Sequence, residues 1–140
     1  MTTAIDTNVM IALWDENAAL SSAAQTALEA AFHRGNLVVA APVFSELMAA
    51  PARSESFVNS FLEDTGITVD WDLDEAVWRA AGRAFQSYAE RRRKQRDFGT
   101  RRILADFLIR AHAQVRGYRL LTLDEGLYQA AFPRLTIETV

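Results

Sequence analysis

Short apolar runs alternate with helix-forming segments along the whole chain, and no other sequence feature restricts the fold as much. The runs predict strands at Thr3–Ile5, Leu37–Ala41, Ile67–Trp71 and Tyr118–Leu123, and a fifth at Leu135–Glu138. Short apolar strands that alternate with helices are typical of a parallel sheet covered on both faces. The pattern therefore predicts an α/β, three-layer fold with a central, mostly parallel sheet of four to five strands flanked by helices.

The segments between these runs have a helical period of apolar residues. The predicted helices cover Asn8–Trp14, Ser21–His33, Val43–Ala50, a stretch from Ser54 to Gly66, Asp74–Arg93, Ile103–Val115 and a short stretch after the fourth strand. A polar loop is expected at Lys94–Thr100. With 140 residues and no repeat or linker, the sequence predicts one domain over residues 1–140.

The residue types exclude several classes of protein. The chain has no cysteine, which excludes disulfides, thiolate metal sites and a cysteine nucleophile. Its first segment, MTTAIDTNVMIAL, has no basic residue before the apolar ones, so we expect no signal peptide. No apolar run approaches the roughly 20 residues of a membrane span. We therefore expect a cytoplasmic protein that makes no contact with a membrane.

Four acids stand where the predicted fold would gather them. Asp6 closes the run TAID and Asp124 closes RLLTLD. If both runs are parallel strands, both acids lie at the carboxyl edge of the sheet, where open α/β folds bind ligands. Glu46 and Asp106 lie in the helical segments FSELMAA and RILADFLIRAHA. Carboxylates in one pocket repel each other unless a cation compensates them, so the pattern indicates a divalent metal site.

Each acid also has a simpler interpretation. Asp6 and Asp124 are suited to capping a helix or forming a turn, and Glu46 to facing solvent. Asp106 and Arg110 are one helical turn apart and would form a solvated pair worth a few tenths of a kcal/mol. These interpretations stay open for each acid alone, but together they leave the common placement of all four unexplained.

The chain resembles the PIN domain family of metal-dependent ribonucleases in the order and context of its acidic segments. The matching segments are IDTNVMIAL, APVFSEL, ILADFLIRAHA and GYRLLTLDEGLY, which span nearly the full length. A chain of this size looks most like a VapC-type toxin of a type II toxin–antitoxin system. The resemblance implies a PIN-like fold and a Mg²⁺- or Mn²⁺-dependent endoribonuclease that hydrolyses RNA phosphodiester bonds. It also implies a homodimer and a cognate antitoxin protein as partner.

The resemblance assigns roles to individual residues. It implies that the catalytic residues are also the metal ligands, bound directly or through water: Asp6, Glu46, Asp106 and Asp124. We expect Asp6 and Asp106 to be the primary ligands. Asn8 and Thr122 match positions that support the site in this family. Phe107 and Arg110 depart from the family pattern, which often has small residues there, and Arg110 could approach the acids or the substrate.

One dense basic run, RRRKQRDFGTRR, precedes the helix of Asp106 in a chain whose net charge is −3. Its position predicts that it steers RNA phosphates toward the acids. The RNA-binding candidates are Arg91, Arg92, Arg93, Arg101 and Arg102. The alternative is a solvated helix end, because basic residues favour helix C-termini.

Other functions fit less well. A haloacid dehalogenase-like phosphotransferase expects an acid where Asn8 stands. A receiver domain would need Asp70 as phosphate acceptor and a lysine at a strand end, whereas the chain's only lysine, Lys94, lies in the basic run. His33 and His112 lack metal-ligand spacing and are expected at the surface or packed in helices. The remaining alternative is a catalytically inactive PIN-like module that binds RNA or protein.

Overall fold

A parallel sheet forms the centre of the molecule in the computed structural model, which describes residues 1–95, 103–124 and 130–140. Within these residues the sheet has five strands in the order β3-β2-β1-β4-β5, and every neighbouring pair is parallel. The strands are β1 (Thr2–Ile5), β2 (Asn36–Ala40), β3 (Ile67–Asp70), β4 (Arg119–Thr122) and β5 (Ile137–Thr139). The predicted α/β class, the parallel sheet and its flanking helices are confirmed.

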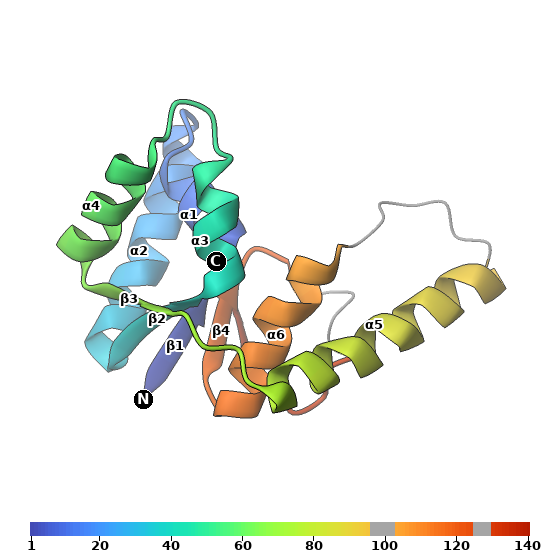
Figure 1. Ribbon diagram of the computed structural model, residues 1–140. Helices are drawn as coiled ribbons and strands as arrows, with labels where there is room; N and C mark the ends of the chain where they lie inside the picture. The colour runs from blue at the N-terminus through green and yellow to red at the C-terminus, as the bar shows by residue number, and fades with distance from the viewer. Residues whose placement is uncertain (96–102, 125–129) are drawn as a thin grey trace.

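Helices connect the strands from β1 to β4, as the periodicity predicted (Figure 1). They are α1 (Thr7–Leu13), α2 (Ala18–Arg34), α3 (Ala41–Met48), α4 (Glu55–Thr65), α5 (Glu75–Gln95) and α6 (Leu104–Arg116). The side chain of Ser54 caps α4 by accepting a hydrogen bond from the Phe57 N–H. Gly66 and Gly117 end α4 and α6 with φ near +70°, where a residue without Cβ is least strained.

The basic run begins in a helix. The prediction that a loop starts at Lys94 is wrong, because Lys94 and Gln95 belong to α5. Figure 1 shows that this end of α5 extends away from the sheet. The rest of the predicted loop, residues 96–100, lies outside the described residues, as does most of the short helix predicted after the fourth strand.

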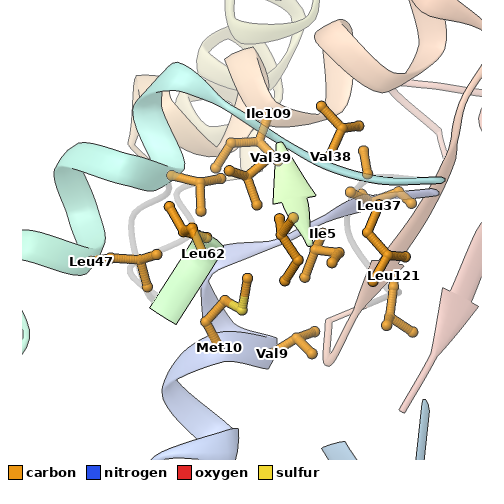
Figure 2. Packing of buried hydrophobic residues seen from close by; sticks show 14 of the residues in the cluster. Ile5, Val9, Met10, Leu37, Val38, Val39, Leu47, Leu62, Ile109 and Leu121 are labelled. Atoms are coloured by element: carbon orange, nitrogen blue, oxygen red, sulfur yellow. The ribbon is translucent and has the colours of Figure 1, made fainter. Parts of the chain in front are cut away.

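Two apolar clusters hold the layers together. The larger joins the sheet to the helices and includes Ile5, Val39, Leu47 and Leu121, all fully buried (Figure 2). The smaller lies where α5 packs against α6, around Phe107. Burial of such side chains stabilises the fold by about 1.5–3 kcal/mol each. The packing fixes the carboxyl ends of β1 and β4 side by side, with α1, α3 and α6 close by.

Candidate active site

The four predicted acids line one cavity. Asp6 follows β1 directly, and Asp124 lies two residues after β4, the neighbouring strand. Glu46 comes from the middle of α3, and Asp106 from the first turn of α6. All four border a cavity of about 430 Å³, together with Thr7, Asn8, Arg110 and others. The fold therefore brings together four carboxylates that are up to 118 positions apart in the sequence.

Asp6 does not use its carboxylate as a helix cap. Its backbone precedes α1, but its side chain makes no capping hydrogen bond. Instead, Oδ2 accepts hydrogen bonds from Arg110 Nη2 and Thr122 Oγ1, each 2.8 Å long. Asp6 and Arg110 are both buried, with side chains 6% and 1% exposed. This is a buried ion pair, and the solvated Asp106–Arg110 pair suggested by their spacing is wrong, because Arg110 turns inward.

Asn8 and Thr122 tie the ends of β1 and β4 together. The Asn8 side-chain amide donates to Thr122 Oγ1 at 3.3 Å, and its carbonyl oxygen accepts the Leu123 N–H at 3.1 Å. The Asp124 N–H donates to Thr122 Oγ1 at 3.1 Å. Both residues predicted to support the site thus contact it, and they fix the backbone that carries Asp6 and Asp124.

The pKa of Glu46 reflects the burial and the charges around it in the cavity. Its Oε1 accepts a 2.7 Å hydrogen bond from the Thr7 hydroxyl. Its pKa is raised, first by burial, and also by the nearby charges of Asp106 and Asp6; the Thr7 hydrogen bond and Arg110 act in the opposite direction. A neighbouring carboxylate raises a pKa because it disfavours a second negative charge. Glu46 is therefore no ordinary solvated glutamate but lies within the field of the other acids.

Asp106 is held at the beginning of its helix. Its Oδ2 accepts a hydrogen bond from the Ile103 N–H at 3.2 Å. The other carboxylate oxygen, Oδ1, takes no part in this hydrogen bond. The Asp106 side chain is partly exposed at the cavity. Asp106 thus serves as a helix cap and also lines the cavity, so the two interpretations of this residue are compatible.

Comparison with known families agrees with this geometry. The PIN domain family model matches residues 3–133, which is nearly the whole chain. The chain belongs to the PIN domain family. PIN domains are generally nucleases, which supports a hydrolase role for this one. A search of curated proteins gave no match.

Solved structures share the fold of this PIN domain. A chain of the VapBC2 structure from Rickettsia felis, bound to a DNA fragment from its promoter, matches with a TM-score of 0.71 and 16% identity, covering 99% of this chain and 98% of that one. A toxin–antitoxin complex from Klebsiella pneumoniae gives 0.68 and 18%, with 98% and 96% covered. VapBC-1 from nontypeable Haemophilus influenzae gives 0.66 and 16%, with 99% and 98% covered. At these identities the likeness concerns the fold alone.

Arg110 is the cavity residue whose role sequence reasoning left undefined. It lies one turn after Asp106 on α6 and is almost fully buried. Besides Asp6, its guanidinium contacts the Asp106 carbonyl oxygen at 3.2 Å and Thr122 Oγ1 at 3.5 Å. The sequence signal for burial was limited to the apolar residues on either side of Arg110 in the middle of α6: Leu108, Ile109, Ala111 and Ala113.

The donor chemistry of the cavity suits a hard divalent cation, because its acids offer carboxylate oxygens. In the described part of the chain, however, no three His, Cys, Asp or Glu side chains lie close enough together to hold a metal ion. Arg110 supplies one positive charge in their midst. The residues therefore fit a metal ion in kind, while one of them, Asp6, is already paired with a guanidinium.

The other singled-out residues have different positions. Arg91 and Arg93 are exposed near the end of α5, and Arg92 is partly buried with a 3.4 Å bond to the Tyr88 hydroxyl. Arg101 and Arg102 lie outside the described residues. His33 was expected either at the surface or packed in a helix, and its side chain is exposed.

Asp70 and His112 form a separate cluster. His112 is fully buried, and its Nε2 lies 2.9 Å from Asp70 Oδ2. The pKa of Asp70 is lowered by the His112 hydrogen bond and the Arg116 charge, although burial acts against them. This aspartate is committed to a structural ion pair, which removes the support for a receiver-type phosphate acceptor.

Among the described helices, none is long and apolar enough to cross a membrane.

Proposed function

We propose that this PIN domain is a Mg²⁺- or Mn²⁺-dependent endoribonuclease that hydrolyses RNA phosphodiester bonds, and that it is the toxin component of a toxin–antitoxin pair. The observation that carries the proposal is the convergence of Asp6, Glu46, Asp106 and Asp124 on one cavity. Four separate segments supply these acids, so local helix capping does not explain their convergence. Membership in a family of nucleases supports the reaction class.

The roles of the residues follow from their positions. A divalent ion, when bound, supplies an activated water and charge stabilisation at the phosphate. Asp106 and Asp124 offer carboxylates at the cavity wall, and Glu46 joins them from α3. Asn8 and Thr122 hold the strand ends, so that the acids keep their relative positions. The apolar core beneath β1 and β4 makes this support rigid.

Removal of divalent ions tests the proposal. We expect cleavage of a panel of structured RNAs in Mn²⁺ or Mg²⁺, and loss of all cleavage in excess EDTA, because the acids alone offer no cation to a phosphate. Cleavage is followed by gel electrophoresis of end-labelled RNA, and readdition of Mn²⁺ to the chelated sample serves as control. Cleavage that persists at full chelation would disprove the metal dependence.

A second candidate is a PIN domain that binds RNA or protein without cutting. The observation that favours it is the Asp6–Arg110 ion pair, which satisfies Asp6 without a metal ion. The same assay separates the two candidates. An inactive module binds the RNA panel or a protein partner but yields no Mn²⁺-dependent cleavage product at any protein concentration.

The basic end of α5 is proposed to bind RNA. Replacing Arg91 and Arg93 by Gln is expected to weaken RNA binding and to lower the slope of log K against log salt by roughly 0.7 per lost phosphate contact. Fluorescence anisotropy at several salt concentrations measures both. The matched control replaces Arg79 and Arg83, two exposed arginines nearer the beginning of α5. Equal effects of the two double variants would mean that RNA senses only the net charge.

The proposed partners are RNA, a cognate antitoxin and a second copy of the chain, in the cytoplasm. The structural likeness to VapBC and other toxin–antitoxin complexes supports the antitoxin. An aromatic group formed by Trp14, directly after α1, and two phenylalanines of α4 offers a surface for a protein partner. There Trp14 packs edge-on against Phe57 and Phe61, Arg53 stacks over Trp14, and Phe57 is 39% exposed. Purification with the neighbouring gene product and size-exclusion chromatography test these assignments.

A further inference from the structure

The cavity contains its own cation. Arg110 is the one buried arginine among the described residues, and its guanidinium lies 2.8 Å from the carboxylate of Asp6. An arginine side chain stays protonated at any physiological pH. The negative charge available to an incoming metal ion is therefore lower by one unit than the acids alone would give.

The position of the guanidinium is fixed on several sides. It is held by Asp6 Oδ2, by the Asp106 carbonyl oxygen and by the Thr122 hydroxyl. Its helix, α6, is packed against α5 and α3. Arg110 therefore has little freedom to leave when a second cation arrives, and the two cations have to share the same acids.

We propose that Arg110 is a built-in competitor of the divalent ion: it occupies Asp6 and lowers the affinity of the acid cavity for metal. This inference rests on the proposed metal dependence. Two mechanisms act in the same direction. Arg110 takes up one oxygen of Asp6 through a charged hydrogen bond, and it repels a second cation a few ångströms away. Such a site would bind metal only weakly, and the occupancy of the nuclease would follow the concentration of free divalent ion.

Binding of Mn²⁺ alone tests this, without RNA or cleavage. We expect R110M to bind Mn²⁺ at least about tenfold more tightly than the wild type, because both the competition and the repulsion are removed. Isothermal titration calorimetry measures the affinity, and circular dichroism reports folding. The double variant D6N/R110M should lose the gain if it depends on the freed Asp6 carboxylate.

Arg116 provides the matched control. It lies on the same helix, but its contacts go to Asp70 and Asp72 rather than to the cavity. R116M removes the same charge from α6 and should leave Mn²⁺ affinity close to that of the wild type. An equal gain in R116M and R110M would overturn the proposal, because net charge alone would then explain it.

The remaining outcomes are also decisive. If R110M unfolds without metal but folds when Mn²⁺ is added, the proposal is supported, since the ion then replaces the missing cation. If R110M stays unfolded, the variant R110K decides. Its ammonium keeps the positive charge but cannot reproduce the two contacts of the guanidinium, one to Asp6 and one to the Asp106 carbonyl oxygen. We therefore expect R110K to bind Mn²⁺ more tightly than the wild type, but with a gain smaller than the gain of about tenfold expected for R110M. If the wild type binds Mn²⁺ and neither R110M nor R110K binds it more tightly, the proposed role of Arg110 is overturned but the metal dependence is not. No Mn²⁺ binding by any variant overturns the proposed metal dependence as well.

Discussion

We expect the D106N variant to cleave RNA more than about 100-fold more slowly than the wild type. Mutation of residues that merely support metal ligands already lowers metal affinity or activity by about 10–100-fold, and Asp106 is proposed to be a ligand itself. Asparagine has nearly the shape of aspartate but no negative charge, so it is a poor ligand for a hard divalent ion. Its side-chain oxygen can still accept the Ile103 N–H that Asp106 accepts at 3.2 Å. The helix cap is therefore kept, and we expect the melting temperature to stay close to that of the wild type.

The measurement is a single-turnover cleavage assay in Mn²⁺, accompanied by thermal unfolding of both proteins. D64N is the matched control, because Asp64 is an exposed aspartate on α4, outside the cavity. It should cleave at the wild-type rate. Full activity in D106N would remove Asp106 from the proposed site, whereas a parallel loss of activity and folding would identify its role as capping alone.

Much of this fold could be predicted because its signals are local. The strands are short apolar runs, and the helices end where glycine permits a positive φ, as at Gly66 and Gly117. The acids at strand ends could be placed at one edge because parallel strands all point the same way. The ends of helices and strands were less predictable. The basic end of α5 continues to Gln95, because Lys and Arg are good helix formers and their polarity does not end a helix.

The partner of Arg110 could not be predicted, because the contact is not local. Its spacing from Asp106 suggested a pair on one helix face, but the packing of α6 turns it toward Asp6, 104 positions away. His112 is a similar case, since its partner Asp70 lies on a strand 42 positions earlier. Pairing of buried charges depends on the angle at which a helix packs on the sheet, which periodicity does not determine.

The Asp6–Arg110 pair is expected to be a major determinant of stability. D6N and R110M should each lower the free energy of unfolding by about 3–5 kcal/mol, because each leaves an uncompensated charge in the interior. The double variant D6N/R110M removes both charges, so its loss should be smaller than the sum of the single losses by about 1–3 kcal/mol. Urea unfolding of the four proteins, without divalent ions, measures this cycle.

The exposed pair Glu75–Arg79 on α5 provides the control cycle. Its side chains are 79% and 67% exposed at a distance of 2.9 Å, and such i,i+4 pairs contribute only about 0.3–0.5 kcal/mol. The distances in the two pairs are nearly equal, so burial is the main difference between the cycles. Additive losses for D6N and R110M would show that the two charges are solvated independently, and the competition proposed for Asp6 would then lose its structural basis. Strong coupling would mean that the fold itself retains a cation beside Asp6, whether or not a metal ion is bound.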